Sequence, residues 1–287
     1  MNENAFDIRV NELIACSIHE DLGDGDVTTN AIFLKNDRAA GEFIAKQGGV
    51  VAGLSIAESV FRFVDPAIVF NILINDGTVV SKGDILANVN GTASSILTAE
   101  RTALNFLQRM SGIASVTKQY VLLTECTKAK ILDTRKTVPG LRLLDKLAVK
   151  LGGGQNHRST LSELFLIKDN HIQVAGSLTK AVQSCISYRN EKFPGLKIEV
   201  EAESLEQVRE ALSLPVDIIM LDNLSIEEMR EAVALIGDKC KTEASGGVNL
   251  ETVKEIALAG VDYISVGALT HSARALDISL ELQINNH

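Results

Sequence analysis

The chain contains no tryptophan, and only 4% of its 287 residues are aromatic. Since 46% of the residues are hydrophobic, the core must be built mainly from aliphatic side chains. No apolar run approaches the roughly 18 residues that a membrane-spanning helix needs, so we expect no membrane partner. The N-terminal segment MNENAFDIRVNELI has neither a basic nor an apolar stretch, which predicts that no signal peptide is present.

Paired cysteines, clustered histidines and basic runs are also missing. Cys16, Cys126, Cys185 and Cys240 form no CxxC pair, a pattern typical of reduced thiols in a cytoplasmic protein. The five histidines lack the HxH or HxxxH spacing of a zinc site. The formal net charge is −9, which excludes nucleic acid and anionic membrane surfaces as expected partners. Any anion site must therefore be a local positive pocket.

The first part of the chain has an α+β pattern. Apolar residues at helical spacing lie in 10–18, an acidic and glycine-rich loop follows at 20–29, and a helix is predicted over 55–64. Strand-like segments with turn residues between them occupy 41–54, 68–75 and 76–91. A long helical stretch then runs from about Ile96 to Cys126, in which we expect Gly112 to break or kink the helix.

Strands and helices alternate through the second half of the chain. Ser204 with Gln207 and Ser225 with Glu228 have the spacing of capping boxes, which indicates short loops before helices. The strands are predicted at 131–136, 165–169, 198–201, 217–222, 241–245 and 262–267, and the helices at 141–151, 178–190, 204–213, 225–236 and 249–259. This alternation predicts a parallel sheet with right-handed crossovers. A barrel and an open doubly wound sheet both fit, and the barrel is favoured, distorted or incomplete because it has fewer than eight strands.

Charged residues stand where four of these strands end. They are Arg135, Lys136, Lys168, Glu201 and Asp222. A lone charge at a buried strand end costs several kcal/mol unless it has a partner, so these side chains are expected to share one polar cavity. The cations suit an anionic ligand, and the carboxylates suit a metal ion or sugar hydroxyls.

Some of these charges have more than one interpretation. Arg135 and Lys136 point to opposite sides of an extended chain, so one could bind a ligand while the other forms a structural ion pair. Lys168 could form a Schiff base or bind an anion. The segment GGGQNHR (152–158) presents His157 and Arg158 on a loop with more glycine than a helix cap requires.

The acidic strand ends and the last two turns complete the pattern. Glu199 and Glu201 lie on the same face of a strand, so alternation alone cannot choose between them. Oxygen ligands without histidine or cysteine suit Mg²⁺. ASGGV (244–248) and SVGAL (265–269) each join a strand to a glycine turn and a helix, an arrangement that favours a phosphate. The alternative is that the glycines serve only tight turns.

Taken together, these segments resemble the quinolinate phosphoribosyltransferase family. The similarity is carried in order by EDLGDGDVTT, ERTALNFLQRMSGIAS, DTRKTVPGLRLLDKLAVKLGGGQNHR, LIKDNHI, EVEAESLEQ, MLDN and EASGGV…VDYISVGAL, from about Glu20 to Leu282. The resemblance implies that quinolinate and 5-phosphoribosyl 1-pyrophosphate, with Mg²⁺, give nicotinate mononucleotide, pyrophosphate and CO₂ in NAD biosynthesis. It also implies an N-terminal α/β sandwich (1–112) and an open, roughly seven-stranded parallel α/β barrel (113–287), whose last residues could pack back on the first domain.

The resemblance further implies a role for each matching residue. The catalytic residues would be Lys136, Lys168, Glu201 and Asp222, with Glu201 and Asp222 holding the ribose hydroxyls and Mg²⁺. Substrate would contact Thr134, Arg135, Lys136, His157, Arg158, Lys168, Ser245, Gly246, Gly247 and Gly267. The family forms homodimers or higher assemblies in which an arginine reaches the neighbouring site, and the matching residue is Arg101. Judged from the sequence pattern without the resemblance, Arg101 borders an apolar helix stripe, and its side chain could equally cover apolar surface.

One departure from the family pattern concerns Thr160. The family usually has glycine there, and threonine does not easily adopt a positive φ, so the His157–Arg158 loop could differ in shape. Rival interpretations are a related barrel enzyme associated with molybdenum transport, a Schiff-base aldolase, and a carrier protein built on the 76–91 hairpins. The intact NHR and KDNH segments oppose the first, Arg135, Lys136 and Arg158 would be surplus in the second, and the third leaves the charged strand ends unexplained.

Overall fold

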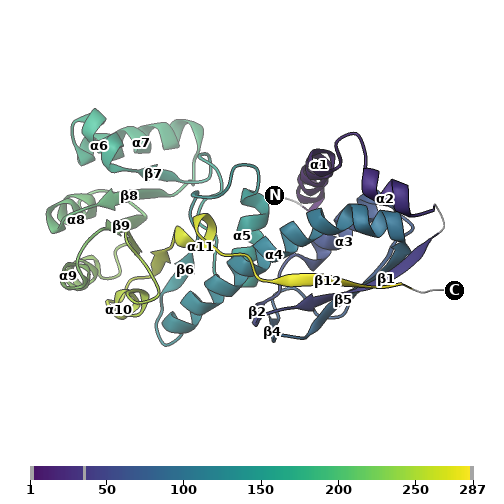
Figure 1. Cartoon of the computed structure of the whole chain (residues 1–287). Coiled ribbons are helices and arrows are strands. Elements are labelled where there is room, and N and C mark those ends of the chain that lie inside the picture. The colour runs from purple at the N-terminus through teal and green to yellow at the C-terminus, as the bar shows by residue number, and fades with distance from the viewer. Residues whose placement is uncertain (1–2, 35–36, 285–287) are drawn as a thin grey trace. The chain divides into compact units, whose positions relative to one another are not determined.

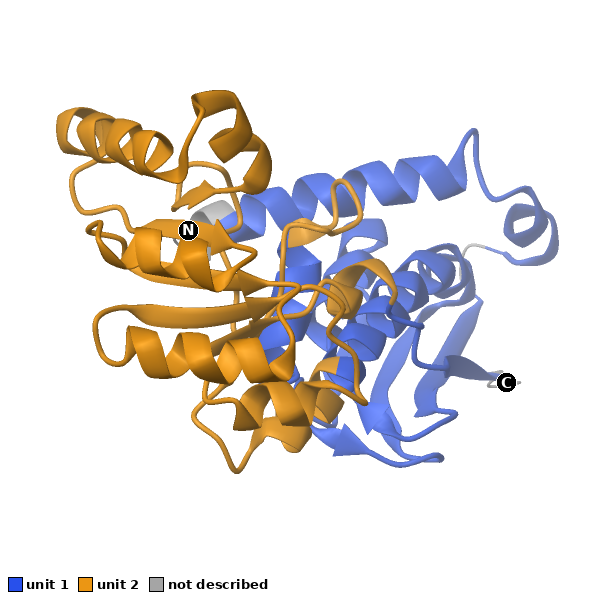
Figure 2. Cartoon of the chain, turned by 90° about the vertical axis from the view of Figure 1, so that its left-hand side faces the viewer, with its two compact units in different colours: residues 1–116, 143–153, 273–287 blue, residues 117–142, 154–272 orange. Residues whose placement is uncertain are grey.

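The computed structural model describes residues 3–34 and 37–284. None of the helices in this part of the chain is both long and apolar enough to cross a membrane. The chain divides into two compact units (Figure 2): residues 1–116, 143–153 and 273–287, and residues 117–142 and 154–272. We call them unit 1 and unit 2. The domain boundary after residue 112 stays a prediction.

Unit 1 contains a four-stranded antiparallel sheet in the order β12-β1-β5-β3 (Figure 1). Its elements are α1 (Glu3–Leu22), α2 (Val27–Ile32), β1 (Arg38–Ala45), β2 (Gly49–Val50), α3 (Leu54–Val64), β3 (Val69–Ile72), β4 (Val79–Val80), β5 (Ile85–Thr92), most of α4 (Ala93–Thr124) and α5 (Arg142–Leu151), and β12 (Ile278–Ile284). Phe43, Phe61 and Phe70 pack together in the core of this unit with ring centroids 5.4–5.8 Å apart.

The helix α4 differs from the prediction at Gly112. It runs without a break from Ala93 to Thr124. A Cβ atom at Gly112 would lie 2.0 Å from the carbonyl oxygen of Arg274, so the glycine is needed for the close approach of another backbone segment. The predicted break was therefore wrong, because sequence alone does not reveal which chain segment crosses a helix.

Unit 2 contains a six-stranded sheet in the order β6-β11-β10-β9-β8-β7, with every pair parallel. Its elements are β6 (Lys130–Leu132), β7 (Phe165–Ile167), α6 (Asp169–Ala175), α7 (Leu178–Lys192), β8 (Ile198–Ala202), α8 (Leu205–Leu212), β9 (Ile218–Asp222), α9 (Ile226–Ile236), β10 (Lys241–Ser245), α10 (Val253–Leu258), β11 (Tyr263–Ser265) and α11 (Ala268–His271). The helices α8, α9 and α10 follow one another along one face of the sheet (Figure 1).

The sheet of unit 2 is open between β6 and β7, which form no ladder with each other within the described residues. Gln155 forms a single parallel bridge with Leu132 beside β6. This one-residue bridge lies where a further strand of the barrel would begin. The predicted α/β fold, with a small N-terminal sheet domain and a mainly parallel C-terminal sheet, is confirmed, and six full strands replace the expected seven.

Local signals place most helices of unit 2 where the sequence predicted them. The Ser204 hydroxyl accepts the backbone N–H of Gln207, and Ser225 forms a reciprocal capping box with Glu228. The predicted helix at 249–259 begins only at Val253. Both α6 and β12 were absent from the prediction. The short loops hold the C-terminal strand ends, and therefore the charged residues, at one edge of the sheet.

Candidate active site

A cavity of about 140 Å³ lies in unit 2 at the C-terminal ends of the strands. Its lining residues are Thr134, Arg135, Lys136, His157, Arg158, Leu166, Lys168, Met220, Ser245 and Ser265. Four of them are arginine or lysine, although the chain as a whole is acidic. The expectation that charges from separate strand ends would meet in one cavity is therefore confirmed for Arg135, Lys136 and Lys168. Arg158 joins them from a loop, whereas Glu201 and Asp222 are not among the lining residues.

The guanidinium group of Arg142 joins the two loops that carry the arginines. Its Nε donates to the Thr137 hydroxyl at 3.0 Å, its Nη1 to the backbone carbonyl of Ser159 at 2.9 Å, and its Nη2 to the backbone carbonyl of Arg135 at 3.3 Å. One side chain thus fixes the loop after β6 to the loop that contains Arg158. The sequence analysis did not single out Arg142, since nothing in its local pattern indicates such a contact.

The two arginines of the cavity retain unused donor capacity. The Nε atoms of Arg135 and Arg158 are buried and have no hydrogen-bond partner within the part of the chain that the structure describes. Nη1 of Arg158 donates to the backbone carbonyl of Leu164 at 2.9 Å. Burial lowers the pKa of Arg158, and the nearby charge of Arg135 lowers it further. Two close guanidinium groups with free donors are suited to a planar dianion.

An ion pair between Lys168 and Glu201 connects the cationic residues of the cavity to the acidic strand ends. Nζ of Lys168 lies 3.3 Å from Oε2 of Glu201, which is only 8% exposed. Burial raises the pKa of Glu201; the charge of Lys168 opposes this shift and the charge of Asp222 adds to it. A divalent cation between Glu201 and Asp222 would relieve their repulsion, so this carboxylate pair fits Mg²⁺.

Glycine turns close the cavity at β10 and β11. Gly246 has φ +90°, and a Cβ atom there would lie 2.2 Å from Oδ1 of Asn223. Gly247 has φ +60° and open space beside its Cα atom. A Cβ atom at Gly267 would lie 3.2 Å from Cδ of Lys136. Because α10 begins six residues after Gly247, the anion cradle at this turn consists of the turn itself, and the prediction of a helix directly after it was wrong.

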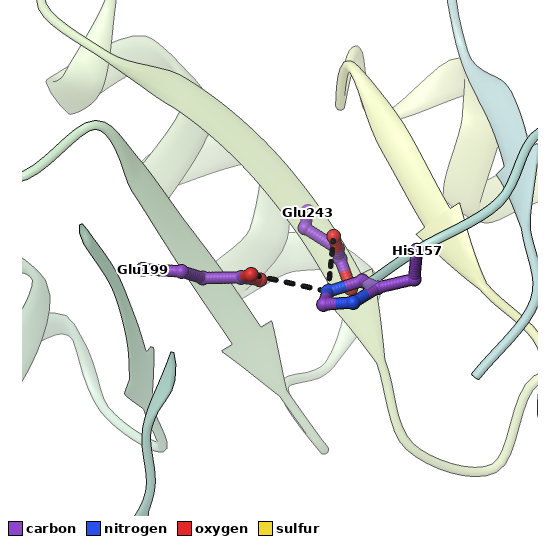
Figure 3. Close-up of side chains that lie close together, drawn as sticks. All are labelled: His157, Glu199 and Glu243. Carbon is purple, nitrogen blue, oxygen red and sulfur yellow. Dashed lines mark hydrogen bonds and ion pairs between the residues drawn. The ribbon is translucent and has the colours of Figure 1, made fainter. Parts of the chain in front are cut away.

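His157 is held from several sides by groups of unit 2. Nε2 of its ring lies 3.1 Å from Oε2 of Glu199 and 3.7 Å from Oε2 of Glu243, as Figure 3 shows. Nδ1 of the ring accepts the backbone N–H of Arg158 at 2.7 Å. The backbone N–H of His157 donates to Oδ1 of the buried Asp133 at 2.9 Å. Both ring nitrogens therefore already face partners inside the protein.

Two models of known families match this chain. Residues 26–111 match the N-terminal domain of quinolinate phosphoribosyl transferase, and residues 113–281 match its C-terminal domain. Together these matches cover most of the chain. The chain belongs to the quinolinate phosphoribosyltransferase family.

Relatives and solved structures agree with this membership. The chain is 45% identical over 287 residues to quinolinate phosphoribosyltransferase [decarboxylating] 2, mitochondrial, of Nicotiana glauca, covering 94% of this chain and 81% of that one. It is 42% identical over 267 residues to the probable nicotinate-nucleotide pyrophosphorylase [carboxylating] of Bacillus subtilis, covering 93% and 91%. The crystal structure of NadC from Streptococcus pyogenes superposes with a TM-score of 0.92 at 40% identity, covering 97% and 98%.

The predicted family residues fall into three groups. Most line the cavity of unit 2 or border it at the glycine turns. Glu201 contacts Lys168, which lines the cavity, and Asp222 is the last residue of β9. Arg101 lies on α4 in unit 1 and is exposed, and its side chain forms no hydrogen bond or ion pair with the other described residues.

The family loop after His157 and Arg158 accommodates Thr160 without strain. Among the described residues that are not glycine, only Asn223 has a positive φ. The Thr160 hydroxyl donates to Oε1 of Glu163 at 3.1 Å, and Oε2 of the same glutamate accepts the backbone N–H of Ser159 at 2.7 Å. Glu163 therefore stabilises the loop. The concern that threonine could not adopt the required φ does not apply to this conformation.

Besides Arg142, the sequence analysis missed the roles of the buried Glu199 and Glu243. Burial raises the pKa of Glu199 to about 7. It also raises the pKa of Glu243 to about 8, and the charge of Glu199 adds to this second shift. Ser265 donates its hydroxyl to Oε1 of Glu243 at 2.6 Å. Alternation in IEVEA did indicate that Glu199 shares a face with Glu201, but nothing in the sequence pairs it with Glu243 across the sheet.

Proposed function

We propose that this protein transfers the phosphoribosyl group of 5-phosphoribosyl 1-pyrophosphate to quinolinate, with decarboxylation to nicotinate mononucleotide. The observation that carries the proposal is the meeting of Arg135, Lys136, Arg158 and Lys168 around one cavity of an acidic protein. Both substrates are polyanions, and bringing two polyanions together requires several fixed cations in a site that excludes water. The names of the relatives support the same reaction.

Arg135 and Arg158 are the groups that would bind the two carboxylates of quinolinate. Their Nε atoms are buried and lack partners among the described residues, so an arriving carboxylate would supply the missing acceptors. A guanidinium fork also binds both oxygens of a carboxylate in one plane. Thr134 and His157 line the wall beside them. This arrangement would orient the ring nitrogen of quinolinate toward the ribosyl donor.

Lys136, Lys168 and the glycine turns are the groups that would hold the donor. The two lysines would face the pyrophosphate, and Ser245, Gly246, Gly247 and Gly267 would hold the 5′-phosphate through the turns that follow β10 and β11. A Cβ atom at Gly267 would lie 3.2 Å from Cδ of Lys136, so this turn and the lysine are close enough to face one anion. Gly246 and Gly247 both have positive φ, a backbone conformation found in turns whose N–H groups bind anions.

Glu201 and Asp222 would bind the ribose hydroxyls and Mg²⁺. When bound, the ion would neutralise charge on the departing pyrophosphate. The two carboxylates would also stabilise positive charge that develops on the ribose ring as the bond to pyrophosphate breaks and the bond to the quinolinate nitrogen forms. The resulting pyridinium nitrogen stabilises the electron pair that stays on the ring carbon when the adjacent carboxylate departs as CO₂, and this carbon then takes up a proton from water to give nicotinate mononucleotide.

The proposal excludes a covalent intermediate on Lys168. Its ammonium group is paired with Glu201, and an ammonium group in an ion pair is a poor nucleophile. Borohydride reduction in the presence of substrates should therefore leave Lys168 unmodified. A substrate-derived adduct on Lys168, detected by mass spectrometry, would favour the aldolase interpretation instead.

The decisive experiment measures CO₂ released from carboxyl-labelled quinolinate by the purified protein with the ribosyl donor and Mg²⁺. Arg135→Ala and Arg158→Ala each remove charged hydrogen bonds of about 1.5–3 kcal/mol, so kcat/KM for quinolinate should fall by about 10- to 100-fold. Arg209→Ala is the matched control, because Arg209 is exposed on α8 and pairs with Glu231. Turnover with nicotinate or nicotinamide but not with quinolinate would assign a different acceptor.

The family resemblance also supports a homodimer or higher assembly in which Arg101 enters the neighbouring site. The side chain of Arg101 forms no hydrogen bond or ion pair among the described residues, and both units expose apolar side chains. Val27 and Leu34 of unit 1 are 80% and 76% exposed, and Leu161 and Val174 of unit 2 are 70% and 90% exposed. A groove of about 690 Å³ adjoins the last two. Such surfaces are typical of protein interfaces.

A subunit-mixing experiment tests the shared site. Mixing an Arg101→Ala subunit with a Lys168→Ala subunit should restore one competent site per heterodimer, whereas neither variant alone should be active. Absence of recovery in verified heterodimers would reject the contribution of Arg101 to a neighbour.

The four free cysteines support a location in the reducing cytoplasm, although several plant relatives are named mitochondrial or chloroplastic.

A further inference from the structure

The buried groups behind the cavity form a continuous set of contacts across three strands. Ser265 of β11 donates to Oε1 of Glu243 on β10 at 2.6 Å. Carboxyl oxygens of Glu243 and of Glu199 on β8, and a ring nitrogen of His157, all lie within 4.8 Å of one another. The carboxyls project from neighbouring parts of the sheet toward the ring (Figure 3). We call these four residues the buried cluster.

The ring of His157 connects the buried carboxyl groups to the cavity. Its Nδ1 accepts the backbone N–H of Arg158, the residue whose guanidinium lines the cavity. A nitrogen that accepts a hydrogen bond carries no proton, so the proton of the neutral ring must lie on Nε2 and point at Glu199. Glu199 therefore stabilises this tautomer by accepting the Nε2 proton on the opposite side of the ring.

We propose that Glu243 is a positioning residue: with Ser265 it holds Glu199 against Nε2 of His157, and the ring then fixes the backbone of Arg158 at the cavity. The inference rests on the proposed function, because the guanidinium that it places is one of the two that would bind quinolinate. Glu243 is 1% exposed and does not line the cavity, so it acts only through its neighbours.

Burial explains why Glu243 can play this part without an added negative charge. Two carboxylates in a dry site repel each other, and the less costly arrangement keeps a proton on one of them. Burial raises the pKa of Glu243, which is 1% exposed and whose one oxygen is already bonded to Ser265, so we place the proton on Glu243. A protonated Glu243 accepts from Ser265 through one oxygen and presents an O–H donor to Glu199 through the other.

A metal ion is a poorer occupant for the same cluster. Three residues could offer one ligand atom each. The ring nitrogen that faces the carboxyls is Nε2, and Nε2 carries the proton because Nδ1 is already an acceptor. Binding a cation would require the ring to lose this proton or to break its contact with Arg158. The cluster is therefore better explained as an internal hydrogen-bond arrangement than as a metal centre.

Two substitutions at Glu243 distinguish this role from simple packing. Glu243→Gln keeps an acceptor for Ser265 and a donor for Glu199, so the KM for quinolinate should stay within about threefold of wild type. Glu243→Ala removes both and should raise that KM by about tenfold or more, with the KM for the ribosyl donor changed less than about threefold. Ser265→Ala should raise the KM for quinolinate in the same direction and by less.

The matched control is Thr242→Val, one residue earlier on the same strand. The Thr242 hydroxyl bonds Asp262 and not the buried cluster, so the substitution should lower stability without changing the KM for quinolinate. Equal losses in Glu243→Gln and Glu243→Ala would overturn the proposal, because a neutral amide would then fail where a neutral acid is claimed to work. An unchanged KM in folded Glu243→Ala would also overturn it.

A second measurement does not require turnover. In protein labelled with ¹⁵N-histidine, the His157 signals, assigned by comparison with a His157→Gln variant, should show the Nε2-protonated tautomer in wild type and in Glu243→Gln. They should show mixed tautomers in Glu243→Ala or Ser265→Ala. A wild-type ring protonated on Nδ1 or on both nitrogens at pH 7 would overturn the proposal. If wild type failed to release CO₂, the proposed function would fail while this test of the cluster still stood.

Discussion

Replacing Asp262 with asparagine should destabilise unit 2 without affecting the cavity. Asp262 precedes β11, at the opposite end of the strands from the cavity. Its Oδ1 lies 2.9 Å from Nζ of Lys241 and 3.3 Å from Nζ of Lys128. Its Oδ2 accepts the backbone N–H and the hydroxyl of Thr242, both at 3.0 Å. This carboxylate therefore joins the beginnings of β6, β10 and β11.

The magnitude follows from the pKa of this carboxyl. Burial acts to raise the pKa of Asp262, but the bonds from Lys241 and Thr242 and the charge of Lys128 outweigh it and lower the pKa to about 2 from the usual 3.8. Such a shift corresponds to roughly 2.5 kcal/mol. Because both lysine side chains are more than half exposed, solvent screening reduces the expected loss to about 1–2 kcal/mol.

The sign of the pH dependence is fixed by the direction of the shift. The folded-state pKa lies below the unfolded one, so the stabilisation is complete above about pH 4 and is lost as the pH falls toward 2. The destabilisation of Asp262→Asn relative to wild type should therefore be largest at pH 7 and much smaller at pH 2.5. No such convergence is expected for Glu251→Gln, an exposed acid for which no side-chain bond is found among the described residues.

Tyrosine fluorescence during urea unfolding provides the assay. The three tyrosines, Tyr120, Tyr188 and Tyr263, all lie in unit 2, and there is no tryptophan to mask them. The midpoint for Asp262→Asn should fall at pH 7 with an unchanged slope. A midpoint equal to wild type at pH 7, or a difference that persists unchanged at pH 2.5, would refute the electrostatic reasoning.

Three further predictions concern single contacts. Arg142→Met should raise the KM for quinolinate by about tenfold, because it frees the loops that carry the cavity arginines. The thermal midpoint should stay within about 2 °C of wild type. An unchanged KM would show that the loops keep their shape without Arg142. Gly246→Ala should raise the KM for the ribosyl donor and lower stability by about 1–3 kcal/mol, since its Cβ atom would meet Asn223; a fully stable, fully active variant would contradict the positive φ. Arg109→Met should lower the free energy of unfolding in urea by about 3–5 kcal/mol, because Nε and Nη2 of Arg109 each donate at 2.8 Å to the fully buried carboxylate of Asp145. The double variant with Asp145→Leu should recover part of that loss.

Several parts of the fold could be predicted because their signals are local. The capping spacing at Ser204 and Ser225 located α8 and α9, and the apolar strands with ionic ends located the cavity. Each signal depends only on residues within a few positions of one another. The convergence of Arg135 and Lys168 then followed from one rule, namely that parallel strands in successive units end at the same edge of a sheet.

The missed features depend on residues that are distant in sequence. The role of Gly112 is set by the backbone of Arg274, and the partner of Glu199 is supplied by Glu243 from another strand. No periodicity in either segment reports the other. Arg142 likewise appears as one more charge on a helix, although its three bonds join two loops. Such contacts have to be seen in three dimensions.

The pairing of β1 with β12 affects how this chain can reach its native state. Ala45 pairs with Ile278, and β1 lies between β5 and β12 in the sheet of unit 1. During synthesis, one edge of β1 must therefore stay without its neighbour until residues 278–284 have left the ribosome. An unpaired strand edge invites association with other chains. Shortening the chain before Ile278 would make that vulnerable stage permanent, so truncated products should aggregate even though the cavity residues are all present.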